Sequence, residues 1–168
     1  GIIPTVMPTL LPMFLKTYVK RYPKVKLKIE ELTTDEIINR LEDGNLDGAI
    51  AASPLNVDNI KERVLYYEPF VGYISPNHRL KIKTEIETSD LDINDILILE
   101  DGHCFRQGVL NLCKIKKEQE LDNFQLESGS IEMLVKLVNE GMGMTLLPYL
   151  NTLDLKDNEK ENLRFFVN

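Results

Sequence analysis

Two hydrophobic periods alternate in the N-terminal part of the chain. Between Thr9 and Arg21 the apolar residues recur at helical spacing, which predicts an amphipathic helix that Pro23 ends. In Val25–Glu30 apolar and polar residues alternate, as in a half-buried strand. A second helix is predicted through Ile37, Ile38 and Leu41, with Thr33 or Thr34 as its cap and Gly44 at its end, followed by a short buried strand at Asp47–Ala52. Strand, helix, strand in this order predicts parallel βαβ units and a layered α/β fold.

The rest of the chain continues with short apolar runs between helical patterns. Val64–Ser75 is rich in β-branched and aromatic residues and is interrupted by Pro69, so it predicts two extended pieces that carry the chain from one lobe to another. The further predicted elements are a strand at Ile96–Leu99, a helix at Arg106–Lys116, a strand at Phe124–Leu126, a helix that Ser128 or Ser130 caps and Gly141 ends, and a strand at Met144–Leu147.

Composition limits the class of protein. The chain has 168 residues, of which 43% are hydrophobic and 28% charged, which is typical of one globular domain or two small lobes. No apolar run reaches the roughly 18 residues of a membrane helix, and no signal peptide opens the chain, so we expect no membrane partner. The net charge of −7 argues against nucleic-acid binding by this segment itself. Two cysteines are too few for a disulfide scaffold and favour a reducing cytoplasm.

Both ends of the sequence have the pattern of strands. Gly1–Ile3 begins as if inside a strand, and Leu163–Val167 is a strand with nothing after it. A strand in an α/β sheet is usually covered by a further helix. We therefore expect the chain to be a fragment of a longer polypeptide.

The segment Ile98–Arg106, which contains Cys104, is the part of the sequence that most strongly indicates a reactive site. Cys104 follows a predicted strand and a glycine turn, at a point where a helix begins. Thiols react as thiolates, and cationic neighbours such as His103 and Arg106, or a helix N-terminus, favour that form. The residues leave two interpretations open: an oxidisable thiol, or a small buried apolar side chain.

Cys113 lies nine positions after Cys104. If the intervening residues are helical, the two are separated by roughly 13.5 Å along the helix, whereas a disulfide requires Cα atoms about 4.4–6.8 Å apart. The two thiols can therefore form a disulfide only if the helix unwinds. Such a pair is poorly suited to a permanent structural disulfide and well suited to a redox-dependent conformational change. Closing a loop of about ten residues constrains the unfolded segment by roughly 2–3 kcal/mol.

Other candidate chemistry is weaker. His78, His103, Cys104 and Cys113 lack the close spacing of zinc ligands, so we expect neither a metal nor a cofactor. Asp101 is placed to orient an imidazole, but nothing else completes an enzyme site. The threonines that precede predicted helices favour capping, and the alternative is that their hydroxyls line a cleft for a small polar ligand; they are Thr5, Thr33 and Thr34.

Short markers along nearly the whole chain follow the order of a known family. They are Ile3-Pro4-Thr5 with Leu11-Pro12, Tyr22-Pro23, Glu31–Thr34, Gly44–Asp47, Ser128–Glu132, Val138, Gly141–Gly143 and Leu147-Pro148. In this order they resemble the effector-binding domain of LysR-type transcriptional regulators. Within that family, Leu99–Cys104 followed by Arg106 and Cys113 is similar to the members that sense hydrogen peroxide.

The resemblance implies a two-lobed α/β fold of the periplasmic-binding-protein-like type 2, with mixed sheets and C-terminally incomplete. It implies crossovers between the lobes near residues 70–75 and 145–148. We therefore expect a regulatory subdomain I at residues 1–72 plus 146–168, and a subdomain II with the redox cysteines at residues 73–145. The family's N-terminal winged helix-turn-helix is absent, so this segment is not expected to bind promoters.

The resemblance also implies a role for each site residue. Peroxide oxidises Cys104 to a sulfenic acid, Cys113 condenses with it to a disulfide, and the segment refolds to alter oligomer packing and transcription. The residues implied for the peroxide pocket are Thr5, Thr34, His103 and Arg106. Gln107 stands where other members often carry Asp, which puts the polar support of that pocket in question.

The predicted function is a stoichiometric redox sensor, and not an enzyme, within a cytoplasmic homodimer or homotetramer. Thioredoxin- or glutaredoxin-type reductants are the expected reset partners. Promoter DNA and RNA polymerase are expected as partners of the full-length regulator only. Two alternatives stay open: a LysR-type domain that senses a small metabolite in the interlobe cleft, and a thiol peroxidase. A solute-binding transport protein shares the fold, but we would expect it to carry a signal peptide.

Overall fold

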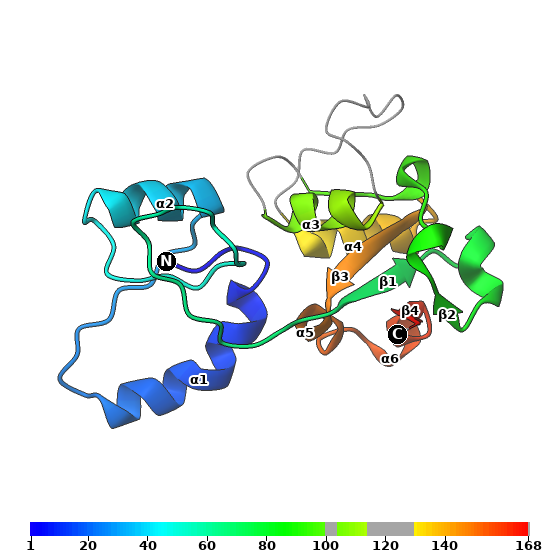
Figure 1. The fold of residues 1–168 in the computed structure, drawn as a ribbon. Helices are drawn as coiled ribbons and strands as arrows, with labels where there is room; N and C mark the ends of the chain where they lie inside the picture. The colour runs from blue at the N-terminus through cyan, green and yellow to red at the C-terminus, as the bar shows by residue number, and fades with distance from the viewer. Residues whose placement is uncertain (100–103, 114–129, 168) are drawn as a thin grey trace. The chain divides into compact units, whose positions relative to one another are not determined.

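The chain forms two compact units. The structure is a computed structural model that describes residues 1–99, 104–113 and 130–167, and its units are Gly1–Tyr67 and Glu68–Asn168 (Figure 1). No helix in the described ranges is long and apolar enough to cross a membrane. The units are described separately below.

The N-terminal unit is organised around the first residues of the chain. Ile2 bridges in parallel to both Glu31 and Ile50, and the Ile50 N–H donates to the Gly1 carbonyl at 2.9 Å. This parallel arrangement agrees with the predicted βαβ rhythm. The strand predicted at Val25–Glu30 is wrong over most of its length, because Val25 and Leu27 stay 50% and 45% exposed.

Two helices complete this unit, α1 (Met7–Arg21) and α2 (Thr34–Glu42). Thr33 is the N-cap of α2 and forms a capping box with Glu36. Gly44, at φ +69°, follows the end of α2 in the left-handed region that glycine adopts without strain. Both predicted helices are therefore confirmed, and the cap of the second is Thr33.

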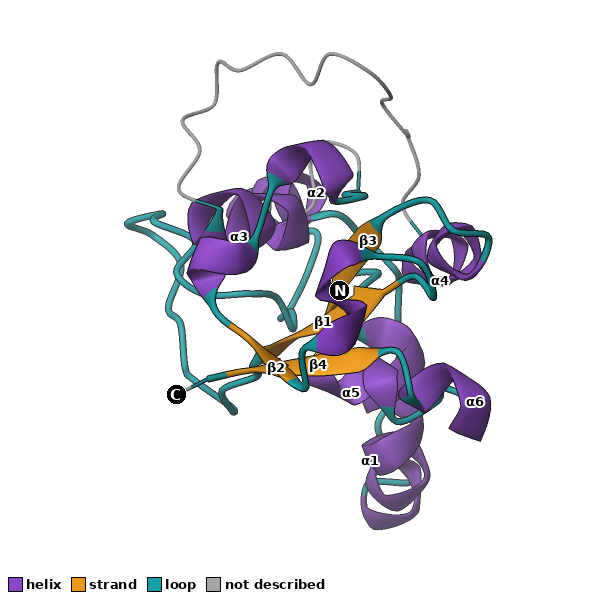
Figure 2. Cartoon of the chain, turned by 90° about the vertical axis from the view of Figure 1, so that its right-hand side faces the viewer, coloured by secondary structure: helices purple, strands orange, loops and turns teal. Residues whose placement is uncertain are grey.

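The C-terminal unit contains a mixed four-stranded sheet (Figure 2). Its order is β2-β4-β1-β3, with β1 antiparallel to β3 and β4, and β2 parallel to β4. The strands are β1 (Phe70–Ile74), β2 (Glu85–Ile86), β3 (Met144–Pro148) and β4 (Leu163–Phe166). The helices are α3 (Cys104–Leu112), α4 (Ile131–Asn139), α5 (Tyr149–Thr152) and α6 (Asp157–Lys160), with 3₁₀ turns η1 (Arg79–Ile82), η2 (Thr88–Asp90) and η3 (Ile93–Asp95).

The period of two in the central strands divides their side chains between two apolar clusters. Ile74 and Leu146 join a large cluster that includes Phe105 of α3, whereas Tyr73 and Leu147 join a smaller one with α4 residues. Successive side chains of a strand point to opposite faces, so neighbouring residues serve different clusters. The large cluster is the one on which α3 rests.

Three predictions for this unit compare with the structure as follows. Met144–Pro148 is a strand, as predicted. The strand predicted at Ile96–Leu99 is reduced to a single parallel bridge, from Ile96 to Met144. Ile96, Ile98 and Leu99 are nevertheless buried, as expected for that segment. Residues 146–168, assigned from the sequence to subdomain I, lie within the C-terminal unit, where β3 and β4 both pair with β1. The predicted Phe124–Leu126 strand lies outside the described residues.

Candidate functional site

Helix α3 is amphipathic and is held by one face. Phe105, Val109 and Leu110 are buried and belong to the large cluster. Gln107 and Asn111 are exposed, and the Gln107 Nε2 donates to the Asn111 Oδ1 at 2.8 Å, one turn apart. The helix therefore forms because its apolar residues recur at helical spacing against the sheet.

Cys104 is the first residue of α3 and is half-buried. At this end of a helix the first N–H groups have no intrahelical carbonyl to donate to, so the Cys104 side chain lies beside unpaired backbone donors of the helix. Arg106, two residues on, donates from Nη1 to the Leu99 carbonyl at 3.1 Å and thereby joins the first turn of α3 to the buried segment before it. The predicted setting of Cys104 at the start of a helix is confirmed.

Cys113 lies at the opposite end of the same helix. Its N–H donates to the Val109 carbonyl at 3.1 Å, and its half-buried side chain packs against the large cluster. Burial raises the pKa of the Cys113 thiol above its usual range, and the negative charges of Asp95 and Asp92 raise that pKa further. Both effects disfavour the thiolate form of Cys113.

Both cysteines are free, and the helix between them keeps them apart. Nine helical steps correspond to about 13.5 Å, twice the Cα separation of roughly 4.4–6.8 Å that a disulfide spans. The predicted helix at Arg106–Lys116 is observed at Cys104–Leu112, and residues from 114 onward lie outside the described ranges.

The threonines differ in what they do. Thr33 accepts from the Glu36 N–H as the cap of α2, but Thr34, the next residue, has a buried Oγ1 without a hydrogen-bond partner in the described part of the chain. Thr5 is buried in the turn before α1, whose N-cap is Val6. Capping therefore accounts for Thr33 and leaves Thr5 and Thr34 open to the ligand-lining alternative.

The predicted site residues are divided between the two units. Cys104, Arg106 and Cys113 lie on or beside α3 in the C-terminal unit, whereas Thr5 and Thr34 belong to the N-terminal unit. His103 lies outside the described residues. Within the described ranges, no group of three or more His, Cys, Asp and Glu side chains is arranged to hold a metal.

An ion-pair cluster near Cys113 was not found from the sequence. His78 is buried; its Nδ1 accepts from the Leu80 N–H at 3.2 Å, and its Nε2 lies 3.0 Å from the Asp95 Oδ2. Because Nδ1 is an acceptor, the ring proton sits on Nε2 and is donated to Asp95. Arg79 Nε donates to the same carboxylate oxygen at 3.0 Å. Only the fold brings Asp95 to His78, 17 positions away in the sequence.

A family model for the LysR substrate binding domain matches residues 1–159. The chain belongs to that family. As a LysR substrate-binding domain, it has the two-lobed, type 2 periplasmic-binding-protein-like fold with a mixed sheet that the resemblance implied. The implied fold class is therefore confirmed.

This LysR substrate-binding domain is similar to several named regulators. It is 36% identical over 161 residues to the HTH-type transcriptional regulator EstR of Acinetobacter baylyi, covering 95% of this chain and 52% of the relative. It is 34% identical over 150 residues to the hydrogen peroxide-inducible genes activator of Dickeya chrysanthemi, covering 89% of this chain and 48% of the relative. The chain thus spans about half the length of the curated relatives it matches.

A solved structure agrees with this assignment. The crystal structure of OxyR from Porphyromonas gingivalis superposes with a TM-score of 0.86 at 30% identity, covering 98% of this chain and 74% of that one. The resemblance of this LysR substrate-binding domain to OxyR and other hydrogen peroxide-inducible activators is therefore confirmed.

Proposed function

We propose that this chain is the peroxide-sensing regulatory domain of a LysR-type transcriptional regulator, with Cys104 as the peroxidatic and Cys113 as the resolving cysteine. The observation that carries the proposal is the placement of two free thiols at the two ends of one helix, α3. The similarity to hydrogen peroxide-inducible activators supports it independently.

In the first step the Cys104 thiolate attacks one oxygen of hydrogen peroxide. The O–O bond breaks, a sulfenic acid forms at Cys104, and the other oxygen leaves as hydroxide, which takes up a proton to become water. The sulfur is oxidised by two electrons and the peroxide is reduced by two. Cys104 is the first residue of α3, and the thiolate is the form of a cysteine that reacts with peroxide.

In the second step the Cys113 sulfur attacks the Cys104 sulfur. The S–O bond breaks, a disulfide forms, and the oxygen leaves with the Cys113 proton as water. The helical distance forbids this step until α3 unwinds. Oxidation is therefore coupled to refolding of the segment, which alters the surface through which the regulator's oligomer packs.

The two thiols react in this order because their surroundings differ. Cys113 is half-buried, has a raised pKa and lies at the helix C-terminus, where a negative charge is disfavoured. Each of these features slows the direct reaction of the Cys113 thiol with peroxide until α3 opens.

The test is stopped-flow loss of free thiol on adding peroxide, followed by peptide mass mapping. Wild type, Cys104→Ser and Cys113→Ser are run side by side. We expect fast oxidation that depends on Cys104 and yields a linked Cys104–Cys113 peptide, and a Cys113→Ser protein that stops at a sulfenic acid trapped by a 1,3-diketone. Oxidation no faster than that of a free cysteine, without a linked peptide, would contradict the proposal.

We also propose that Thr5, Thr34, His103 and Arg106 assist the first step. Support for Thr34 comes from its buried hydroxyl, which capping does not use. The adjacent Thr33 provides a matched control. Thr34→Val is expected to slow sulfenic-acid formation and leave the unfolding free energy of the protein nearly unchanged, whereas Thr33→Ala should cost about 1 kcal/mol of stability and leave the rate intact. Equal effects of both substitutions on the rate would remove Thr34 from the site.

A second candidate is a LysR-type domain that senses a small metabolite. The observation in its favour is the 36% identity to EstR, which is named as a transcriptional regulator without reference to peroxide. Calorimetric binding of an organic acid together with slow thiol oxidation would favour this candidate. Multiple-turnover consumption of peroxide with a thiol reductant would instead indicate a thiol peroxidase.

The finer assignments concern the complete regulator. We propose that it is a cytoplasmic homodimer or homotetramer, that its DNA-binding domains contact promoter DNA and RNA polymerase, and that thioredoxin- or glutaredoxin-type proteins reduce the disulfide. Reduction of the Cys104–Cys113 disulfide by a purified thioredoxin, followed by mass mapping, checks the last of these.

A further inference from the structure

One aromatic ring of the sheet packs closely on α3. Phe70, the first residue of β1, lies edge-to-face on Phe105, with ring centroids 5.5 Å apart and ring planes at 68°. A Cβ atom added to Gly108 would lie 3.0 Å from the Phe70 Cζ and 3.1 Å from its Cε2. The Phe70 ring therefore touches the backbone of α3 directly, and the absence of a side chain at position 108 permits this close approach.

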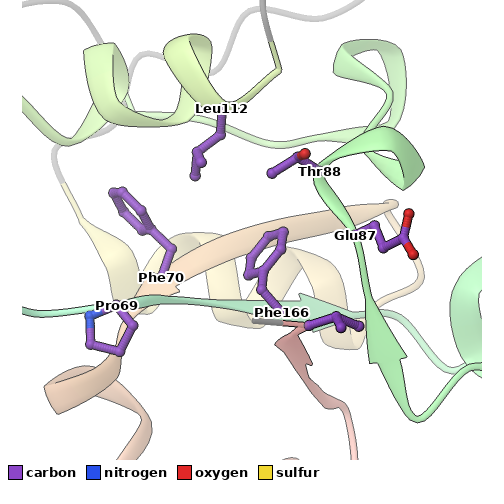
Figure 3. A pocket seen from close by; sticks show the side chains of 7 residues that line it. Pro69, Phe70, Glu87, Thr88, Leu112 and Phe166 are labelled. Carbon is purple, nitrogen blue, oxygen red and sulfur yellow. The ribbon is translucent and has the colours of Figure 1, made fainter.

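The contacted positions form one stripe along the helix. Phe105, Gly108 and Leu112 are three and four residues apart, which places them above one another on a helix surface. Figure 3 shows Leu112 extending from α3 toward the side where Phe70 and Phe166 lie. The stripe extends from the residue after Cys104 to the residue before Cys113.

The last turn of α3 borders empty space. A groove of about 500 Å³ is lined by Leu112 together with Pro69, Phe70, Thr88 and Phe166 (Figure 3). Surfaces that face a void lose the dispersion contacts that a filled interior supplies. Among the described residues, Leu112 therefore has no packed neighbour on the side where it borders this groove.

These contacts bear on the second chemical step. Cys113 reaches Cys104 only when the turns that contain Gly108 unwind, and those are the turns that Phe70 covers. We propose that Phe70 is a positioning residue: by packing on Phe105 and Gly108 it holds α3 helical and thereby sets the rate at which Cys113 closes the disulfide. This inference rests on the proposed function and assigns a regulatory residue to it.

The test measures the two steps separately in the whole chain. Sulfenic-acid formation is followed by 1,3-diketone trapping in the Cys113→Ser background, and disulfide formation by rapid quenching and mass mapping with both cysteines present. In Phe70→Leu we expect disulfide formation to accelerate about tenfold, because the aromatic pair and the contact with Gly108 are lost. Sulfenic-acid formation is expected to stay within about twofold of wild type, since the first step does not require α3 to open.

Phe166→Leu is the matched control. Phe166 packs against the same cluster and lines the same groove, but it lies on β4. The substitution is chemically the same, phenylalanine to leucine, so Phe166→Leu measures how a general loss of core packing changes the rate of disulfide formation. An acceleration by Phe166→Leu equal to that by Phe70→Leu, or equal acceleration of both chemical steps, would overturn the proposal.

One further variant, Thr88→Ile, keeps the test decisive if Phe70→Leu unfolds, and a double substitution extends the test if Phe70→Leu folds. Thr88→Ile replaces a hydroxyl by an ethyl group in the groove that Leu112 lines and should slow disulfide formation. Adding Gly108→Ala to Phe70→Leu should slow it again, because the new Cβ then meets no ring and alanine favours the helix. If the wild type forms no disulfide, the proposed function fails; if the wild type forms it and these variants leave its rate unchanged, only the role of Phe70 fails.

Discussion

The two ends of α3 carry the same functional group in opposite settings. Cys104 begins the helix, where the first N–H groups have no intrahelical acceptor, and Arg106 joins that turn to Leu99. Cys113 follows the helix C-terminus, half-buried, with Asp95 and Asp92 raising its pKa. The comparison teaches that one short helix can place two thiols of the same chain in different surroundings, and the proposed order of oxidation rests on that difference.

Changing the stability of α3 is expected to have the largest effect on the difference between the two thiols. Asn111 is exposed on the helix, so substitutions there change helix propensity with little change in packing. Relative to Asn111→Ala, Asn111→Gly should destabilise the helix by about 1 kcal/mol and Asn111→Pro by about 3 kcal/mol. We expect disulfide formation to accelerate roughly fivefold and more than a hundredfold, respectively.

Quenched-flow mass mapping of the Asn111 series at one peroxide concentration provides the measurement. The rate of sulfenic-acid formation at Cys104 serves as the internal reference. A disulfide rate that does not follow the helix propensity of position 111 would mean that opening of α3 does not limit the second step.

The N-terminal end is tested next, through Arg106. Arg106→Gln removes the cation and its hydrogen bond to the Leu99 carbonyl. Because hydrogen bonds of charged groups contribute about 1.5–3 kcal/mol, we expect sulfenic-acid formation to slow by roughly tenfold. Lys136→Gln, the same loss of charge at an exposed position of α4, is the control and should leave the rate unchanged. Equal rates in the two variants would contradict the role of Arg106.

Alkaline pH should reduce the stability that the Cys113 thiol contributes at the C-terminal end of α3. The pKa of Cys113 is raised in the folded protein, so the buried thiol stabilises α3 below the pKa of an unfolded thiol, and this contribution is lost as pH rises through the folded-state pKa. Urea unfolding of Cys104→Ser, compared with Cys104→Ser/Cys113→Ala, should show an extra loss above about pH 8.5. Because Cys113 is only half-buried, we expect less than about 1 kcal/mol. Parallel pH profiles for the two proteins would exclude the effect.

The smallest effect is expected from removing one negative charge near Cys113, that of Asp92. Asp92 accepts hydrogen bonds from the N–H and Nδ2 of Asn94, and Asp92→Asn retains the carbonyl oxygen that accepts them while removing the negative charge. The pKa of Cys113 should fall slightly, and disulfide formation near pH 8 should accelerate by about twofold or less. The pH dependence of the second step measures this change, and an unchanged profile would assign the shift to burial and Asp95.

Much of the local structure was predictable because it depends on neighbouring residues. The helices α1, α2 and α4, the Ser130 cap and the strand β3 all follow from apolar spacing and from capping chemistry a few residues away. The expectation for Val25–Glu30 was wrong because alternation alone does not guarantee a pairing partner: Val25 and Leu27 stay half exposed. The hydrogen bond of His78 with Asp95 also escaped prediction, since no local pattern links two residues that distant in the chain.

The sequence by itself determined that Cys104 starts a helix and that Cys113 lies too far along that helix to pair with it. Both statements need only the rise per residue of a helix and the preferences of its ends. The tertiary structure decided what surrounds Cys113 and what packs on α3. Burial on the large cluster, the approach of Asp95 and Asp92, and the packing of Phe70 on Gly108 all depend on segments that only the folded chain brings together.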